Sequence, residues 1–221
     1  MVSSRIRAIL FDMDGTLAET ESLWTETLVR ALRKRGWEMD EEDRAFVVGH
    51  SFQDIYEHLR AKYGLAISSE ELQGWMNEEK EAVFGEALQP LPGAVEAVRR
   101  LGLKRPVALV SGSPREDVEF ILGRLGLQDA FHLKLGVEDY PRGKPAPDGF
   151  LEAARRLGVP PEACVVFEDS TAGIRAAKAA GMRCIAVQAG NFSGQDQSEA
   201  DLVISTLEEA EAALERLEAG R

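Results

Sequence analysis

Two pairs of carboxylates offer the strongest chemistry in this sequence. Asp12 and Asp14 come directly after an apolar run near the N-terminus, and Glu168 and Asp169 follow another apolar run. Asp and Gly are common turn formers, so the first pair taken alone could be only a turn. The second pair favours a functional site, because ligands of open parallel sheets bind at the carboxyl ends of the strands.

Small hydroxyls and a lysine accompany these carboxylates. Ser111, Gly112 and Ser113 follow a third apolar run, and Lys144 lies in a Gly-Lys-Pro loop ahead of an expected helix. An ammonium group neutralises the charge of a phosphoryl group, and hydroxyls bind its oxygens. The combination therefore predicts a site for phosphate chemistry.

If these segments converge, four carboxylates share one cleft. Each close pair of like charges costs on the order of a few kcal/mol at an effective dielectric constant of about 20, so a cation is required. The available ligands are oxygens, with no His or Cys among them. A hard ion that keeps several waters and accepts a phosphate oxygen is Mg²⁺ rather than zinc. We therefore predict Mg²⁺ as the cofactor.

After residue 93, expected strands alternate with expected helices, and these elements would position the residues named above. The expected strands are apolar and β-branched, as in strands covered on both faces. Together with an N-terminal strand, they predict a parallel sheet whose strands are residues 6–11, 107–110, 165–167, 185–187 and 202–204. Each expected helix runs into a glycine that follows a Lys or Arg by two or three residues, which suits a helix C-terminus. These helices span residues 94–101, 116–125, 147–157 and 172–180, and the acidic residues 207–217 form a final surface helix.

The segment between the first two strands breaks this alternation. It holds helical patterns without a convincing strand, at residues 22–35, 52–63 and 68–84. Ser68 and Glu71 form a capping box at the start of the third helix. We predict an α/β fold with a Rossmann-like parallel sheet in residues 1–18 and 89–221, and an inserted α-helical domain in residues 19–88.

Composition argues against several classes of partner. The formal net charge is −12 and the longest basic run is residues 33–35, so no basic surface serves nucleic acid or an anionic membrane. The N-terminal apolar stretch, residues 8–13, is too short for a signal peptide or a membrane helix. We expect a cytoplasmic monomer whose two cysteines, Cys164 and Cys184, are buried core thiols.

In chain order these segments resemble the four sequence motifs of the haloacid dehalogenase superfamily. The motifs here are Asp12-x-Asp14-x-Thr16, Ser111, Lys144 and Glu168-Asp169. The Asp-x-Asp pattern alone is weak, but four motifs at strand ends in this order are highly specific. The inserted helical segment resembles the small cap domain of one branch of the superfamily, which includes β-phosphoglucomutase-like proteins and sugar-phosphate phosphatases.

The resemblance implies covalent catalysis. Asp12 would attack phosphorus, and Asp14 would protonate the leaving alkoxide and later deprotonate water. Lys144 would balance the charge of Asp12 and of the transferred group. The phosphoryl group would be bound by a set of small residues: Thr16, Ser111, Gly112 and Ser113.

The same resemblance implies the Mg²⁺ ligands. They would be a carboxylate oxygen of Asp12, the backbone carbonyl of Asp14 and the carboxylate of Asp169, with Glu168 coordinating directly or orienting a metal-bound water. Dehalogenases of this superfamily lack the second aspartate, so Asp14 favours phosphoryl chemistry. We therefore predict a Mg²⁺-dependent phosphatase that hydrolyses small phosphorylated metabolites, such as sugar phosphates, through an aspartyl-phosphate.

Substrate specificity is expected to come from the cap. Lys80 falls where relatives place a cap lysine that faces the active site, although a solvated helix lysine is an equal alternative. Arg115 is a second cation expected to bind substrate. Trp24, His50 and Trp75 could line the substrate pocket or form the core of the cap.

The main alternative is a hexose-phosphate mutase of the same branch. Phe52 stands where β-phosphoglucomutases carry a phosphate-binding arginine, and Pro114-Arg115 replaces their Lys-Asn pair. These departures favour hydrolysis over mutase activity. A non-catalytic regulator that binds phosphorylated ligands would have no use for a nucleophile beside a proton donor. A phosphoacceptor signalling domain would be shorter and would lack the helical insert.

Overall fold

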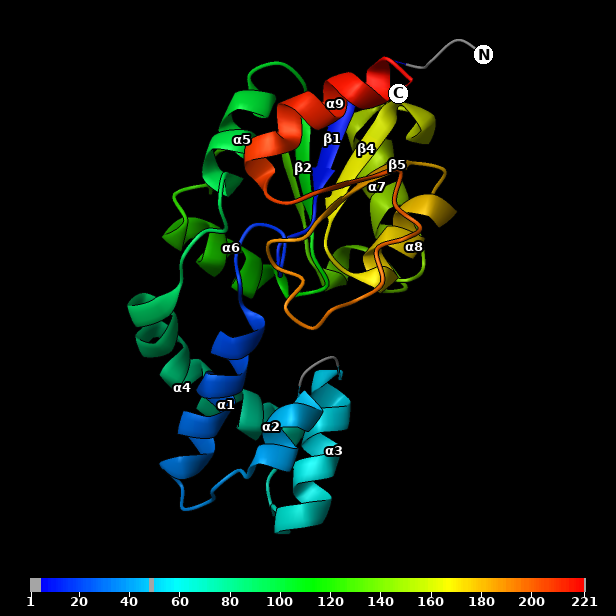
Figure 1. The fold of residues 1–221 in the computed structure, drawn as a ribbon. Coiled ribbons are helices and arrows are strands. Elements are labelled where there is room, and N and C mark those ends of the chain that lie inside the picture. The colour runs from blue at the N-terminus through cyan, green and yellow to red at the C-terminus, as the bar shows by residue number, and fades with distance from the viewer. Residues whose placement is uncertain (1–4, 48–49, 221) are drawn as a thin grey trace. The chain divides into compact units, whose positions relative to one another are not determined.

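The structure is a computed structural model that describes residues 5–47 and 50–220. The chain forms two compact units, which are traced in Figure 1. We call Met1–Glu19 together with Gln89–Arg221 the core unit, and Thr20–Leu88 the helical unit. Each unit has a hydrophobic cluster of its own.

A parallel sheet forms the centre of the core unit. Within the described residues it has six strands in the spatial order β3-β2-β1-β4-β5-β6. The strands are β1 (Ala8–Phe11), β2 (Val107–Val110), β3 (Leu133–Leu135), β4 (Cys164–Glu168), β5 (Arg183–Val187) and β6 (Leu202–Ile204). Every residue of β1, β2 and β4 is buried, as expected for central parallel strands. The predicted α/β fold is confirmed.

Helices cover both faces of this sheet. One face is covered by α7 (Asp148–Leu157) and α8 (Thr171–Ala179), and the other by α5 (Ala94–Gly102) and α9 (Ala210–Glu218) (Figure 1). Between β2 and β3 the chain forms α6 (Arg115–Arg124). The described part of the unit also contains three short 3₁₀ helices: η1 (Val137–Asp139), η2 (Pro161–Ala163) and η3 (Leu207–Glu209).

The strand order places a topological switch point at the centre of the sheet. After β1 the chain builds β2 and β3 on one side, and then returns to place β4 on the other side of β1. Such a switch point opens a crevice at the carboxyl ends of the two strands. Phe11 pairs with Phe167 in the register and stacks on it with ring centroids 5.0 Å apart. The next residues, Asp12 and Glu168, therefore reach this crevice side by side.

The helical unit packs its apolar helix faces together. Its helices are α1 (Glu21–Arg33), α2 (Glu41–Val47), α3 (Phe52–Tyr63) and α4 (Ser69–Ala87). Many of their buried residues form one cluster, which includes Leu32, Leu59 and Leu72. At the start of α4 the Glu71 backbone N donates to Ser68 Oγ at 3.2 Å, and the Ser68 backbone N donates to Glu71 Oε2 at 2.8 Å. The predicted capping box is confirmed.

Two short elements were not predicted, and one predicted helix ending is wrong. The unpredicted elements are α2 and β3, whose length and internal charge hide any apolar period. The prediction that Gly102 stops α5 is wrong, because Gly102 is the last residue of the helix and Leu103 keeps a right-handed conformation. Gly102 serves packing instead, since a Cβ there would lie 3.3 Å from Val107 Cγ2.

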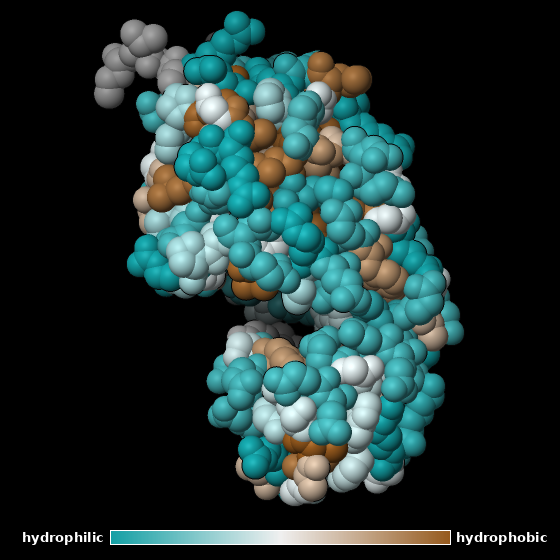
Figure 2. Space-filling model, turned by 180° about the vertical axis from the view of Figure 1, so that it is seen from behind, coloured by the Kyte–Doolittle hydropathy of each residue, from teal (hydrophilic) through white to brown (hydrophobic). Residues whose placement is uncertain are grey.

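The surface is mostly hydrophilic on the face that Figure 2 shows, where hydrophobic side chains form only small groups. Among the described residues, no helix is both long and apolar enough to cross a bilayer. Cys164 and Cys184 are buried, as predicted. Burial raises the pKa of the Cys164 thiol to about 11 and also raises that of Cys184.

Candidate active site

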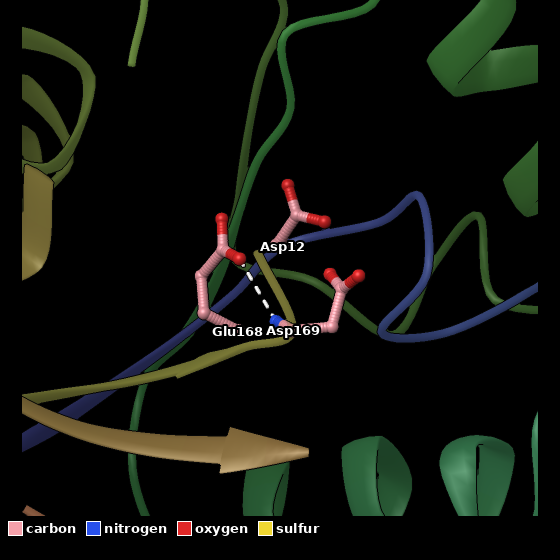
Figure 3. Close-up of side chains that lie close together, drawn as sticks. All are labelled: Asp12, Glu168 and Asp169. Atoms are coloured by element: carbon pink, nitrogen blue, oxygen red, sulfur yellow. Dashed lines mark hydrogen bonds between the residues drawn. The ribbon is translucent and has the colours of Figure 1, made fainter. Parts of the chain in front are cut away.

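Three buried carboxylates meet at the switch point. Asp12 follows β1 and is held by its backbone N, which donates to the Phe167 carbonyl at 3.0 Å. Glu168 is the last residue of β4 and Asp169 comes next. One carboxylate oxygen of each of the three residues lies within 4.8 Å of the others. Figure 3 shows these carboxyl groups gathered around a common space.

The turn after β4 is held by hydrogen bonds to the side chain of Glu168, which folds back onto it. Glu168 Oε2 accepts hydrogen bonds from the backbone N of Asp169 and of Ser170, both at 2.8 Å, and from Ser170 Oγ at 2.9 Å (Figure 3 draws the first). Ser170 also caps α8, since its Oγ accepts from the Gly173 backbone N at 3.0 Å. Helix capping and carboxylate orientation thus depend on the same serine.

Lys144 bridges the two strands that carry the acids. Its Nζ donates to Asp12 Oδ1 and, at 2.7 Å, to Glu168 Oε1. Burial lowers the pKa of the Lys144 ammonium, but attraction to Asp12 and Glu168 outweighs this effect and raises the pKa above its usual range. These contacts therefore favour the charged form of Lys144.

The second carboxylate of the first motif is held by hydroxyls from the loop after β2. Asp14 Oδ2 accepts from Ser111 Oγ at 3.1 Å and from Ser113 Oγ at 3.0 Å. The Ser113 backbone N donates to Ser111 Oγ at 3.0 Å, which orders the loop after β2. The buried Tyr140 hydroxyl donates to the Ser111 carbonyl at 2.6 Å. The first two motifs are therefore in direct contact.

Thr16 and Gly15 bring the first turn close to Asp169. Thr16 Oγ1 donates to Asp169 Oδ1 at 3.1 Å and is buried. Gly15 has a φ of 80°, and a Cβ at this position would lie 2.2 Å from Asp169 Oδ2. Only glycine allows this approach without displacing the carboxylate.

The charges of the cluster favour a divalent cation. Burial raises the pKa of Asp12 to about 8, with Glu168 and Asp14 adding to the effect and Lys144 opposing it. Burial and the charges of Asp12 and Glu168 likewise raise the pKa of Asp169 to about 9. The three clustered carboxylates and one ammonium sum to a formal charge of −2 when all are ionised. All donors are oxygens, so the residues fit Mg²⁺.

Two predicted substrate-binding cations lie outside this cluster. Arg115 begins α6, where its guanidinium pairs with Asp139 and its backbone N donates to Glu138. Lys80 lies on α4 in the helical unit and is buried. Gly112 is exposed in the loop between Ser111 and Ser113. The binding of substrate by these residues stays a prediction.

The aromatic residues considered for the substrate pocket pack within the helical unit. Trp24 lies against Phe84 with ring centroids 4.7 Å apart, and Trp75 stacks on Trp37 at 5.9 Å. Trp24 and Trp75 pack against the buried cluster of the unit. His50 stacks on Phe46 with centroids 4.0 Å apart. These contacts favour the core alternative for both tryptophans.

Sequence reasoning missed two residues that support the site. Ser170 orients Glu168, and its place directly after an acidic pair and before a helix was the available signal. Tyr140 supports the loop after β2 from a segment with no recognisable pattern. Its contact depends on tertiary packing, and no local signal identifies it.

Comparisons with known proteins identify relatives of this chain. The model of the haloacid dehalogenase-like hydrolases matches residues 6–181. The chain is 34% identical over 181 residues to the phosphorylated carbohydrates phosphatase of Thermotoga maritima, covering 81% of this chain and 84% of that protein. It is 32% identical over 184 residues to fructose-1-phosphate phosphatase YqaB of Escherichia coli, covering 83% and 97%. The crystal structure of CbbY from Rhodobacter sphaeroides in complex with phosphate is 27% identical, with a TM-score of 0.82 and coverage of 95% and 99%.

Proposed function

Because this chain belongs to the haloacid dehalogenase-like hydrolase family, we propose that it is a Mg²⁺-dependent phosphatase that works through an aspartyl-phosphate on Asp12. The observation that carries this proposal is the buried cluster of Asp12, Glu168 and Asp169 around Lys144. A nucleophile, a fixed cation and oxygen ligands for a metal are the parts that phosphoryl transfer requires.

We assign the two chemical steps to the first motif. A carboxylate oxygen of Asp12 forms a bond to phosphorus while the bond from phosphorus to the ester oxygen breaks, and Asp14 gives its proton to the leaving oxygen. Asp14 then takes a proton from water, whose oxygen attacks phosphorus and displaces the Asp12 carboxylate. The products are the alcohol and inorganic phosphate. Ser111 and Ser113 support these roles by holding the Asp14 carboxylate in place.

The same residues are suited to hold Mg²⁺. Asp12, Asp169 and the backbone carbonyl of Asp14 would be its ligands. Both carboxylate oxygens of Glu168 already accept hydrogen bonds, so we assign Glu168 to orienting the site rather than to direct coordination. When bound, the ion offsets the charge of the phosphate oxygens and of the carboxylates around it.

We propose small phosphorylated carbohydrates as the substrates. The two named phosphatases to which the chain is similar act on phosphorylated carbohydrates and on fructose 1-phosphate. We further propose that the helical unit acts as a cap that selects the substrate, with Lys80 as the residue that contacts it. Lys80→Ala should then raise KM or lower kcat for a preferred substrate, whereas unchanged constants would remove Lys80 from the site.

A substrate panel tests the proposed function. Phosphate release should be measured against sugar and nucleotide monophosphates, with Mg²⁺ and after complete chelation. We expect release from sugar phosphates that depends strictly on Mg²⁺. Release that survives chelation would contradict the metal assignment, and a clear preference for nucleotides would contradict the substrate class.

Hydrolysis must also be separated from mutase activity. A mutase retains a bisphosphorylated intermediate and therefore needs a second phosphate-binding site. Phe52 and Pro114 offer no charge for this purpose, and the guanidinium of Arg115 already pairs with Asp139. Incubation with β-glucose 1-phosphate, a trace of the 1,6-bisphosphate and Mg²⁺ should yield phosphate faster than glucose 6-phosphate. Faster formation of glucose 6-phosphate would favour the mutase instead.

A further inference from the structure

Gln197 lies in the loop that joins β5 to β6, and its side chain is buried against two strand ends. Its Nε2 donates to the Asp169 backbone carbonyl at 2.7 Å and to the Val187 carbonyl at 3.0 Å. The residue is only 8% exposed. Both partners are carbonyl oxygens, which only accept, so the amide nitrogen must be the atom that faces them. The side chain thus joins the turn after β4 to the end of β5.

The same loop touches the turn that carries Asp12 and Asp14. Gly190 packs so closely on this turn that a Cβ at position 190 would lie 1.8 Å from the Gly15 carbonyl oxygen. Gly15 in turn lies against the Asp169 carboxylate. One loop therefore contacts both of the turns that supply the clustered carboxylates.

Other bonds fix this loop independently of Gln197. Gln195 Oε1 accepts from the Thr171 backbone N at 2.9 Å, and the Thr171 hydroxyl donates to the Asp196 carbonyl at 2.8 Å. Asn191 Nδ2 donates to the Gln195 carbonyl at 2.8 Å, and the Gln195 backbone N donates to Asn191 Oδ1 at 2.6 Å. The loop should therefore stay in place when the amide of Gln197 is removed.

We propose that Gln197 is a positioning residue for the metal site, acting through the backbone of Asp169. Thr16 holds the carboxylate of Asp169 by one hydrogen bond, and Gln197 holds the main chain of the same residue by another. Together they set where the Asp169 carboxylate lies relative to Asp12. This inference rests on the proposed Mg²⁺ site.

The test is Mg²⁺ binding to the whole chain, measured by isothermal titration calorimetry. Gln197→Met keeps the length of the side chain and removes its donors. We expect the Kd for Mg²⁺ to rise about tenfold or more, as for other residues that orient metal ligands. The Mg²⁺ concentration for half-maximal phosphate release should rise in parallel, while kcat at saturating Mg²⁺ stays close to the parent value. A residue that serves only folding would not produce this split.

Gln188→Met is the matched control, because Gln188 is exposed at the start of the same loop. It should bind Mg²⁺ as the parent does. If Gln197→Met does not fold, Gln197→Asn decides the question, since its shorter amide cannot reach both carbonyls and should also weaken binding. A folded Gln197 variant with the parent Mg²⁺ affinity would overturn the inference and leave the proposed function standing. A parent protein that binds no Mg²⁺ and releases no phosphate would overturn both.

Discussion

Each unit of this protein buries an aspartate, and the pKa values of these two carboxyl groups are shifted in opposite directions. In the helical unit Asp43 is fully buried and accepts hydrogen bonds from Lys62 Nζ at 2.8 Å and from the Tyr63 hydroxyl, with His58 Nε2 at 2.9 Å. Burial would raise the pKa of Asp43, but these donors hold it well below its usual range. In the core unit burial raises the pKa of Asp12 to about 8, although Lys144 opposes the shift.

This difference distinguishes a carboxylate that stabilises the fold from one that belongs to the candidate active site. Asp43 has enough donors to remain an anion inside the protein, so it stabilises the packing of α2 against α3. Asp12 shares one ammonium with Glu168 and lies beside a third acid, so its charge is incompletely balanced. A buried carboxylate whose negative charge is incompletely balanced indicates a site where a cation and a substrate are expected.

The same substitution at the two aspartates should therefore have opposite effects. Asp12→Asn removes the proposed nucleophile and relieves repulsion, so turnover should fall by about 10³-fold or more while stability without metal is no lower than that of the parent. Asp14→Asn should lower turnover in the same way, because it removes the proposed proton donor. Phosphate release and thermal unfolding measure the two effects. Asp12→Asn with activity near the parent value would show that the nucleophile is wrongly assigned.

At Asp43 the effect should fall on folding. Asp43→Asn removes the negative charge that Lys62, Tyr63 and His58 face and replaces one accepting oxygen with a donor NH₂ group. It should lower the free energy of unfolding by about 1–3 kcal/mol. All three tryptophans, Trp24, Trp37 and Trp75, belong to the helical unit, so tryptophan fluorescence during urea unfolding reports on that unit.

The exposed Asp129 provides the control for this change, because Asp129→Asn alters charge equally and removes no buried acceptor. It should leave the fluorescence transition unchanged. An Asp43→Asn protein as stable as the parent would contradict the structural role of Asp43, since the donors around it would then contribute nothing to folding.

Acid should remove the contribution of Asp43. The pKa of Asp43 is lower in the folded state than in the unfolded chain, so its stabilisation is complete above the unfolded pKa and is lost as the pH falls through the folded pKa. The stability difference between the parent and Asp43→Asn should be constant above about pH 5 and should shrink below about pH 4. Urea unfolding at several pH values measures it. A difference that grows toward low pH would contradict the sign of the shift.

The smallest expected effect concerns the hydroxyls at Asp14. Ser113→Ala removes one of the two hydrogen bonds that Asp14 Oδ2 accepts from Ser111 and Ser113. We expect kcat to fall about threefold to tenfold, the size of one hydrogen bond. Ser205→Ala, at an exposed position, should leave kcat unchanged. Loss of all activity in Ser113→Ala would mean that Ser113 does more than hold Asp14.

The parts of the site that are encoded locally could be predicted from the sequence. Asp12 and Glu168 follow buried apolar runs, and the ends of parallel strands are where such residues gather. The sequence analysis expected the motif segments to converge, and Lys144 contacts both Asp12 and Glu168. Their catalytic roles stay proposals.

Other features depend on contacts between distant segments. Asp43 lies on α2 and its donors His58, Lys62 and Tyr63 lie on α3, and nothing in the spacing of these residues distinguishes them from solvated polar side chains. Gln197 lies in a polar loop without a motif, yet its amide is buried at two strand ends. β3 was missed because Lys134 interrupts its three residues. Pairing of such short segments is set by the sheet around them.

Trapping of the covalent intermediate tests the central claim most directly. Borohydride reduces an acyl phosphate, so treatment during turnover with a sugar phosphate and Mg²⁺ should convert the aspartate that carries the phosphate to homoserine. Mass spectrometry of the digested protein should then locate the change at Asp12 in the parent and find none in Asp12→Asn. Modification of a different carboxylate, or no modification of a parent protein that is releasing phosphate, would contradict the account.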